Sequence, residues 1–372
     1  MNILLLTAHF KPNIGGVETH LNDLVYVLTK RKWRVWVLTY KPLTTNVYSK
    51  VYEKMGLLTI IRIPWLFGLF YKLVQYPLLE FLYLLPGLFI IAPLVIIATN
   101  PEVIHANGLV AGFAGVFWAK IFGKKIIVST HSIYSFPKKG IYRNFVSFIF
   151  KNANYCLGLS KQAVREIESL GAAKIKVKNF TYWIDLKKFK KVKEAKNKLG
   201  WKEKFTVLFV GRLVPEKGIK ELLESVKSWD KNISLKIIGS GPLKDKVKET
   251  TLKLSNVDFI EGIDSDNLPI YYSGADLLIV PSVSEEGFGR VILEALACET
   301  PIIGARRGAI PEALDGTVGK IIDISPESIR RTIEYFYKSK DELKKLAKNC
   351  RKFAERRYSE KNADTIIKTY QS

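Results

Sequence analysis

Two glutamates and two glycines near residue 290 are arranged like a phosphate-binding turn. The stretch Glu286-Gly-Phe-Gly-Arg290 follows an apolar run, and the residues from Arg290 onward are expected to form a helix. Glycines let a ligand reach backbone N–H groups, and the positive end of a helix dipole favours an anion. Glu286 precedes this helix and Glu294 lies about one turn inside it. The two carboxylates would flank a bound phosphate and hold hydroxyl groups on either side of it, as a nucleotide-sugar requires.

Two cationic side chains share another loop. The stretch Gly211-Arg212-Leu-Val-Pro-Glu-Lys217 follows an expected strand, Phe205–Val210, in the second half of the chain. Arginine and lysine at the carboxyl end of a strand can clamp a diphosphate, because they supply positive charge and hydrogen-bond donors. The same residues also suit a solvated loop, so this motif alone leaves both interpretations open.

The first half of the chain contains two further candidate features. Gly15 and Gly16 follow the first expected strand and open a helix, where glycines let an anion approach the backbone. An ordinary strand–helix turn would have the same sequence. His131 ends the expected strand Lys125–Ser129. A single histidine is usually structural, but ligands of α/β proteins bind at the carboxyl ends of strands.

Metal and disulfide chemistry are not expected. Asp264-Ser-Asp266 resembles the metal-binding Asp-x-Asp of some transferases, but it fits a loop and the N-cap of a helix that starts near Leu268. The three cysteines are widely spaced, and the four histidines lack metal-ligand spacing. The N-terminus lacks the basic region and the long apolar core of a signal peptide, so we expect a cytoplasmic protein.

Positive charge is concentrated in the first half of the chain. The net charge is +23, of which residues 1–190 carry +17 and residues 191–372 carry +6. A basic half suggests an anionic surface or substrate, although a general richness in lysine would give a similar excess. Nucleic acid is not an expected partner, because no nucleic-acid-binding motif accompanies the charge. The length of 372 residues, 48% of them hydrophobic, is enough for two domains with separate cores.

Strands and helices are expected to alternate in both halves. Expected strands are Ile3–Leu6, Arg34–Thr39, Leu58–Ile63, Val103–His105, Lys125–Ser129, Tyr155–Leu159, Phe205–Val210, Ser234–Ile238, Val257–Ile260, Leu277–Val280, Pro301–Ile303 and Lys320–Ile322. Expected helices are Val17–Lys30, Val110–Ile121, Lys161–Leu170, Ile219–Ser228, Leu243–Leu254, Leu268–Ser273, Arg290–Ala297, Ser325–Lys338 and Asp341–Tyr358. This alternation predicts parallel sheets in two Rossmann-like, doubly wound α/β domains, residues 1–190 and 191–355. The Lys-rich segment Lys187–Lys204 is interpreted as the linker.

The segment Leu57–Asn100 is unusually apolar. It contains no charged residue between Glu80 and Glu102, and Pro86, Gly87 and Pro93 are expected to interrupt it. Three interpretations stay open: a membrane-spanning helix, a helix buried in the domain, or a surface that enters the membrane interface. The basic first half favours the interface. The residues that would support it are Trp65, Phe67, Phe70, Tyr71 and Lys72.

Taken in order, these segments resemble the GT-B glycosyltransferases of family 4, the retaining type, over nearly the whole chain. The most specific part is Glu286-Gly-Phe-Gly…Glu294-Ala-Leu-Ala. Supporting segments are Gly211-Arg…Lys217-Gly, Ala275-Asp-Leu-Leu-Ile-Val-Pro-Ser282, Val103-Ile-His-Ala-Asn-Gly108 and Gly308-Ala-Ile-Pro-Glu312. The resemblance implies an N-terminal acceptor-binding domain, to which a C-terminal helix, residues 356–372, returns. It also implies a C-terminal domain that binds a nucleoside-diphosphate-sugar.

The resemblance also implies roles for individual residues. Arg212 and Lys217, after Gly211, would hold the pyrophosphate, Glu286 the sugar hydroxyls and Glu294 the ribose. The remaining implied donor contacts are Gly15 and Gly16 at the diphosphate, His131 at the sugar, Ile263 near the base, and Phe288, Gly289, Arg290 and Val291 at the sugar and phosphate. Neither a metal nor a further cofactor would be needed, because two cations can stabilise the departing diphosphate. In the retaining reaction that the resemblance implies, the acceptor attacks the sugar on the same face that the diphosphate leaves. This reaction requires no nucleophile from the enzyme.

The sequence departs from the family's pattern in three places. Tyr182-Trp-Ile-Asp185 replaces the usual Asn-Gly-Val-Asp, His105-Ala-Asn107 replaces His-x-His, and Ala297-Cys-Glu299 replaces Ala-Cys-Gly. The expected acceptor is a lipid or a lipid-linked glycan on the inner face of the cell membrane, with an anionic membrane surface as partner. A soluble transferase that acts on a sugar or small metabolite, and a non-catalytic nucleotide-sugar-binding subunit, are the alternatives.

Overall fold

The computed structural model describes residues 1–13, 15–44, 47–66, 68–73, 76–132, 136–137, 139–202 and 204–372. The chain divides into two compact units. Unit 1 consists of Met1–Tyr182 with Ala363–Ser372, and unit 2 consists of Trp183–Asn362. The sequence predicted domain limits at residues 190 and 355, whereas unit 2 runs from Trp183 to Asn362. The eight residues 183–190, predicted for the first domain, therefore belong to unit 2.

Unit 1 is built on an eight-stranded sheet with the order β3-β4-β2-β1-β5-β6-β7-β8. Its strands are β1 (Asn2–Thr7), β2 (Arg34–Tyr40), β3 (Tyr52–Met55), β4 (Leu58–Ile63), β5 (Val103–Asn107), β6 (Lys125–Thr130), β7 (Tyr155–Gly158) and β8 (Val177–Asn179). All neighbouring strands are parallel except β3 and β4. The central strands are nearly continuous apolar runs, because helices cover both faces of a parallel sheet.

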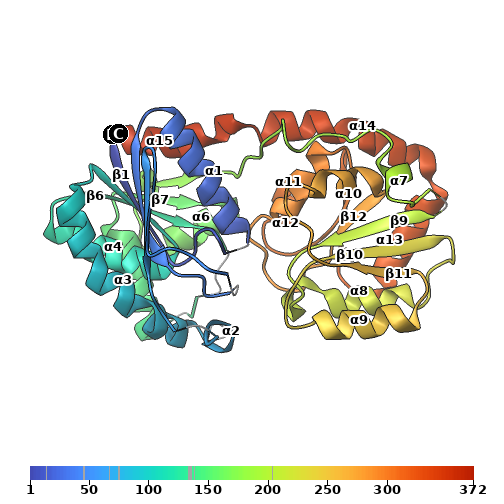
Figure 1. Ribbon diagram of the computed structural model, residues 1–372, viewed down its shortest axis with the longest axis horizontal. Coiled ribbons are helices and arrows are strands. Elements are labelled where there is room, and N and C mark those ends of the chain that lie inside the picture. The colour runs from blue at the N-terminus through green and yellow to red at the C-terminus, as the bar shows by residue number, and fades with distance from the viewer. Residues whose placement is uncertain are drawn as a thin grey trace. The chain divides into compact units, whose positions relative to one another are not determined.

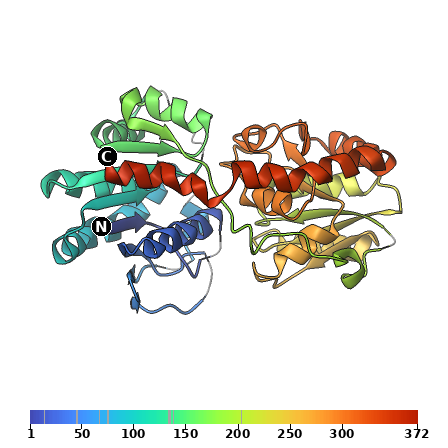
Figure 2. The same cartoon turned by 90° about the horizontal axis from the view of Figure 1, so that it is seen from above.

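The helices of unit 1 are α1 (Gly16–Lys30), α2 (Phe70–Leu73), α3 (Pro77–Thr99), α4 (Leu109–Ile121), α5 (Ile141–Asn152), α6 (Lys161–Ser169) and α15 (Ala363–Gln371), with a 3₁₀ turn at Lys174–Lys176. Figure 1 shows α3 and α4 together on one face of this sheet, and their apolar side chains share its main core. Figure 2 shows α15 beside α1, where Arg31 forms an ion pair with Asp364 at 2.8 Å.

Unit 2 is built on a six-stranded parallel sheet with the order β11-β10-β9-β12-β13-β14. Its strands are β9 (Phe205–Val210), β10 (Ile233–Ile238), β11 (Val257–Ile260), β12 (Leu277–Val280), β13 (Ile302–Ala305) and β14 (Gly319–Ile322). Its helices are α7 (Ala195–Lys198), α8 (Ile219–Val226), α9 (Lys244–Lys253), α10 (Leu268–Gly274), α11 (Arg290–Ala297), α12 (Ile310–Ala313), α13 (Pro326–Lys338) and α14 (Lys340–Arg357), with 3₁₀ turns at Pro215–Lys217 and Glu360–Asn362. Figure 1 shows α8 and α9 on one face of the sheet and α10 and α11 on the other.

The two doubly wound α/β units confirm the predicted fold class, and both sheets reverse their strand order once. The reversal lies between β1 and β5 in unit 1 and between β9 and β12 in unit 2. Connections leave in opposite directions at such a switch point, so the loops diverge and leave a crevice at the carboxyl ends of the strands. Each unit therefore has one place where its fold favours a ligand.

The interruption predicted at Pro86, Gly87 and Pro93 is wrong. Helix α3 continues through all three residues. The hydroxyl of Tyr40 replaces part of the helical hydrogen bonding: it accepts from the N–H of Leu88 at 2.9 Å and donates to the carbonyl of Leu84. A side chain at position 87 would overlap the Tyr40 ring, which explains the glycine. A side chain inserted between a carbonyl and the N–H four residues on is one recognised cause of a bend in a helix.

The apolar segment places one side against the core and the other in solvent. Of the described residues, only α3 forms a helix long and apolar enough to cross a membrane by length and composition. Leu84, Leu88 and Ala92 are fully buried, whereas Leu82 and Ile90 are 61% and 64% exposed. Phe67 and the side chain of Tyr71, which the sequence assigned to a membrane interface, lie outside the described part of the chain.

The Lys-rich segment after residue 187 packs on unit 2. Lys188 pairs with Asp266 at 2.6 Å, and Lys196 pairs with Asp276 at 2.5 Å. Asp266 is not the N-cap predicted for the next helix, because Asn267 occupies that position before α10. The sequence did not predict the short elements β3, β8 and α12, nor the 12-residue helix α5. The two strands among them lie at the edges of the sheet of unit 1.

Candidate active site

Three loops meet at the carboxyl ends of β9, β12 and β13 in unit 2. The N–H of Val283 donates to the carbonyl of Glu216 at 3.0 Å, which joins the loop after β12 to the loop after β9. The N–H of Ala309 donates to the carbonyl of Glu286 at 2.9 Å, which joins the loops after β12 and β13. These bonds hold both candidate motifs at the switch point between β9 and β12.

Two glycines allow this close approach. Gly218 has a φ of +68°, and a Cβ there would overlap the carbonyl oxygen of Pro281. Gly308 has a φ of +54°, and a Cβ there would overlap the backbone of Glu286. Neither position can accept a side chain without moving the neighbouring loop, because both the left-handed backbone and the contact require glycine. The glycine after Lys217 and the Gly308 segment thus fix the position of Glu286.

Lys217 and Glu286 form the centre of the candidate site. They are 69 residues apart in sequence, yet the ammonium group of Lys217 forms an ion pair with Oε2 of Glu286. The hydroxyl of buried Ser282 donates to the same oxygen at 3.0 Å. Both charged side chains are largely shielded, with 24% and 16% of their surface exposed, so water screens their attraction only in part. The structure brings together one cation and one carboxylate that the sequence singled out.

Glu294 lies deeper, on the inner side of α11. The hydroxyl of Tyr272 donates to its Oε2 at 2.7 Å, and Nε of Arg290 lies 3.9 Å from its Oε1. Burial, followed by the nearby Glu294 carboxylate, raises the pKa of Tyr272 well above its usual value, so this phenol stays protonated and donates. Arg290 also donates to the carbonyl of Trp183 at 3.3 Å. Tyr272 was not predicted, because nothing in its local sequence marks a contact 22 residues away.

The N-terminus of α11 follows the predicted turn. Gly289 caps the helix in the left-handed region, with a φ of +61°, and a Cβ there would crowd Ile292. The ring of Phe288 is buried and meets Tyr358 edge-on at a centroid distance of 5.8 Å, so Phe288 anchors this turn from inside. Val291 is partly exposed in the first turn.

The other predicted residues of unit 2 lie on neighbouring loops. Arg212 follows Gly211 at the carboxyl end of β9 and is exposed. Ile263 is partly buried in the loop after β11, two strands away from β9 in the sheet. Both side chains therefore belong to the same edge of the sheet as Lys217. Among the described residues, neither Arg212 nor Ile263 forms a hydrogen bond with Lys217.

Three predicted residues belong to unit 1. His131 is buried with both ring nitrogens engaged: Nε2 lies 3.0 Å from Oδ1 of Asn107, and Nδ1 lies 3.0 Å from the hydroxyl of Tyr182. Burial lowers the pKa of His131 to about 3, so its imidazole is neutral at physiological pH. Gly15 and Gly16 open α1, and the carboxylate of Glu18 occupies the space that a Cβ at Gly15 would take.

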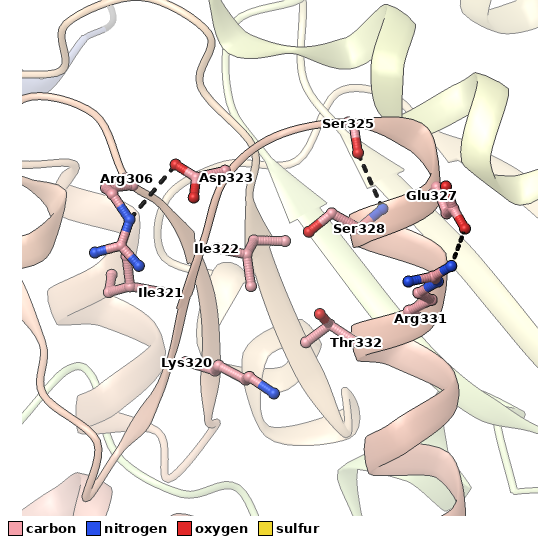
Figure 3. Close-up of a pocket in the computed structure, with 10 residues that line it drawn as sticks. All are labelled: Arg306, Lys320, Ile321, Ile322, Asp323, Ser325, Glu327, Ser328, Arg331 and Thr332. Carbon is pink, nitrogen blue, oxygen red and sulfur yellow. Dashed lines mark hydrogen bonds and ion pairs between the residues drawn. The ribbon is translucent and has the colours of Figure 1, made fainter.

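A surface cavity of about 410 Å³ in unit 2 is poorly suited to bind an anion. Figure 3 shows it between the ends of β13 and β14 and the start of α13. Its two arginines already have partners, since Arg306 pairs with Asp323 at 3.4 Å and Arg331 pairs with Glu327. Lys320 lies over the ring of Tyr335. Within the described residues, no group of three or more His, Cys, Asp or Glu side chains could hold a metal ion.

Comparisons with known proteins agree with the fold. The family model described as Glycosyltransferase Family 4 matches residues 14–179, and the model described as Glycosyl transferases group 1 matches residues 191–370. The chain belongs to the GT-B glycosyltransferases of this family 4, group 1 type. It is therefore a glycosyltransferase.

Three known proteins illustrate the similarity. An uncharacterized glycosyltransferase of Methanocaldococcus jannaschii is 25% identical, covering 99% of this chain and 97% of the relative. A GDP-mannose-dependent phosphatidylinositol monomannoside mannosyltransferase of Mycolicibacterium smegmatis is 30% identical over 141 residues, which are 34% of this chain and 37% of that enzyme. The solved structure of Anabaena HepE in complex with UDP-glucose has a TM-score of 0.78 at 19% identity, covering 100% of this chain and 99% of that one.

Proposed function

We propose that this glycosyltransferase moves a sugar from a nucleoside diphosphate to a membrane-associated acceptor, with retention of configuration at the reacting carbon. The observation that carries the donor part is the Lys217–Glu286 pair at the switch point of unit 2. A cation suits the diphosphate and a carboxylate suits the sugar hydroxyls, and both occupy the place where this fold favours a ligand. The complex of a similar fold with UDP-glucose supports a nucleotide-sugar donor.

In this proposal the protein contributes mainly electrostatic stabilisation. Negative charge grows on the diphosphate as its bond to the sugar breaks, and Lys217 and Arg212 supply positive charge there. Glu286 holds sugar hydroxyls, Glu294 holds the ribose, and Gly289, Arg290 and Val291 present the start of α11. With two cationic side chains assigned to the leaving group, turnover should not need a divalent metal. The roles of Gly15, Gly16, His131 and Ile263 at the donor remain predictions.

The membrane part of the proposal depends on α3. Its outward residues include Leu79, Leu82, Ile90, Leu94 and Ile97, all apolar and all more than 40% exposed. A row of exposed apolar side chains is costly in water and typical of surfaces that meet a membrane or a partner. The excess positive charge of the first 190 residues would favour an anionic lipid surface. The mannosyltransferase relative, whose name includes a phosphatidylinositol mannoside, supports a lipid acceptor.

Thermal shift against a panel of nucleotide-sugars tests the donor assignment. The panel would hold UDP-, GDP-, ADP- and dTDP-sugars, with free sugars and nucleoside monophosphates as ligand controls, all in EDTA. A donor at 100 times its Kd stabilises the native state by about 2.7 kcal/mol, so the matching donor should raise the melting temperature by several degrees. A panel in which no nucleoside-diphosphate-sugar shifts the melting temperature would contradict the proposal.

A further inference from the structure

Tyr182 is the last residue of unit 1, and the chain passes to unit 2 at its peptide bond with Trp183. It lies outside the helices and strands, yet its side chain is only 3% exposed. The ring centroids of His20, on α1, and of Phe180 lie 4.4 Å and 6.0 Å from its own. The point where the chain leaves unit 1 is therefore held by aromatic packing rather than by secondary structure.

The hydroxyl of Tyr182 forms a hydrogen bond that determines the tautomer of His131. Burial lowers the pKa of His131, so its neutral imidazole carries a proton on only one nitrogen. Nδ2 of Asn107 donates to the carbonyl of His105 at 3.2 Å, so it is the Asn107 oxygen, Oδ1, that faces Nε2 of His131 at 3.0 Å. An amide oxygen only accepts. Nε2 of His131 therefore carries the proton, and Nδ1 accepts from the Tyr182 hydroxyl at 3.0 Å.

Both ring nitrogens of His131 are thus bonded within unit 1. His131 and Asn107 line a cavity of about 180 Å³ at the carboxyl ends of β1, β5 and β6, at the switch point of this unit. Tyr182 does not belong to the described lining of this cavity. A ligand there would meet the His131–Asn107 pair, and Tyr182 would act on that ligand only through His131.

The two partners of His131 are residues at which the sequence departs from the family's pattern. Asn107 replaces the second histidine of His-x-His, and Tyr182 replaces the asparagine of Asn-Gly-Val-Asp. These residues are distant in the sequence, yet they contact the same imidazole ring, one at each nitrogen. The pairing indicates that the two replacements act together on His131.

The residue after Tyr182 is attached in a similar way within unit 2. The carbonyl of Trp183 accepts a hydrogen bond from Nη1 of Arg290 at 3.3 Å. Arg290 begins α11, the helix that carries Glu294. Each of the two residues joined by the connecting peptide is therefore bonded to a residue to which the resemblance assigns a donor contact, His131 in unit 1 and Arg290 in unit 2.

We propose that Tyr182 is a positioning residue for sugar transfer. Its hydroxyl holds His131 in the Nε2–H tautomer with the imidazole in one orientation, and its ring fixes the point where the chain leaves unit 1. It acts through His131 and takes no chemical step of its own. The inference rests on the proposed function for the placement of His131 at the donor, whereas the tautomer of His131 does not depend on that function.

NMR spectroscopy of ¹⁵N-labelled histidine tests this network directly. The chain has four histidines, so the signals of His131 can be assigned from the spectrum of His131→Ala. Wild type should show a protonated Nε2 and an unprotonated Nδ1 at His131. Tyr182→Phe removes the hydroxyl and keeps the ring beside His20, so it should shift the Nδ1 signal of His131. A protonated Nδ1 in wild type, or a His131 spectrum that Tyr182→Phe leaves unchanged, would overturn the inference.

Tyr370→Phe is the matched control. Tyr370 is also buried in unit 1, and its hydroxyl lies 2.6 Å from Nδ1 of another buried histidine, His105. This variant should shift the signals of His105 and leave those of His131 in place. Equal changes at His131 in both variants would indicate a general disturbance of unit 1 and would refute the specific role of Tyr182.

Donor hydrolysis without acceptor measures the consequence for the reaction. A small misplacement of a group at the reacting atoms can cost about 100-fold in rate, so Tyr182→Phe should lower kcat about tenfold and change the donor KM less. Tyr370→Phe should stay within about twofold of wild type. In the His131→Ala background, Tyr182→Phe should have less than about a twofold further effect, because residues of one network are not additive.

Wild-type kcat in Tyr182→Phe, or a further loss of about tenfold in the His131→Ala background, would contradict the positioning role. A wild-type enzyme that neither binds nor hydrolyses any nucleotide-sugar would instead contradict the proposed function. The NMR spectra need no substrate, so they would still decide whether Tyr182 holds the tautomer of His131.

Discussion

Lys217 and Glu286 come from two loops far apart in the sequence that form one candidate site. The ion pair between them is supported by the hydroxyl of Ser282 and by the backbone contacts at Gly218 and Gly308. Removing one member of a shielded pair leaves the other without its partner. When a diphosphate binds, the ammonium group of Lys217 would contact phosphate oxygens, either instead of the Glu286 carboxylate or in addition to it.

Lys217→Ala should lower kcat by roughly 100-fold or more, because it removes a charge-stabilising group at the leaving diphosphate. The measurement is single-substrate kinetics of sugar release from the matching donor. Lys227→Ala is the control, because Lys227 is an exposed lysine paired with Glu224 on the neighbouring α8. Near-normal turnover in Lys217→Ala would refute the role assigned to this lysine.

Residue types and spacing predicted where the side chains of the candidate site lie on strands, loops and helices, but not which of them contact each other. Glu286, Glu294, Arg212 and Lys217 could each be placed at the end of a strand or the start of a helix from local sequence. The Lys217–Glu286 contact depends on β9 lying next to β12, which strand order decides and local sequence does not. Tyr272 could not be predicted, because its contact with Glu294 arises from the packing of α10 against α11.

Among the elements, α3 is the one for which the sequence left the most interpretations open: a membrane-spanning helix, a buried helix, or a surface at the membrane interface. Its composition is apolar on all sides, so periodicity could not distinguish a buried helix from one that meets a membrane. The structure places Leu84, Leu88 and Ala92 in the core and leaves Leu82 and Ile90 outside. The interruption expected at Pro86 was wrong, because the helix continues through it. The Tyr40 hydroxyl, from the distant strand β2, bridges the Leu84 carbonyl and the Leu88 N–H just beyond that proline.

Replacing the outer face of α3 should weaken membrane binding. The double variant Leu82→Glu/Ile90→Glu removes two exposed apolar side chains, each contributing about 1.5–3 kcal/mol when buried in lipid, and adds negative charge. Sedimentation with vesicles that contain anionic lipid should fall at least 100-fold in apparent affinity. The control is Leu252→Glu on α9, where an 87% exposed leucine belongs to unit 2. Equal sedimentation of wild type and double variant would argue against α3 as the membrane surface.

At the scale of the whole molecule, each unit has its own sheet, core and switch point. Alternating strands and helices in the sequence were enough to predict two doubly wound units, because long buried strands and amphipathic helices have strong periodic signals. The last helix, α15, belongs to unit 1, where the Tyr370 hydroxyl lies 2.6 Å from Nδ1 of His105. The short edge strands β3 and β8 have too few residues for a periodic pattern, so the sequence did not predict them.

The central claim is sugar transfer with retention from a nucleoside diphosphate, supported by protein cations rather than by a metal. The most direct measurement is proton NMR of the product formed by the wild-type enzyme from its matching donor and a hydroxylated acceptor in EDTA. We predict turnover under these conditions and a product whose anomeric configuration matches that of the donor. A product of inverted configuration, or activity that disappears in EDTA and returns with a divalent cation, would contradict the account.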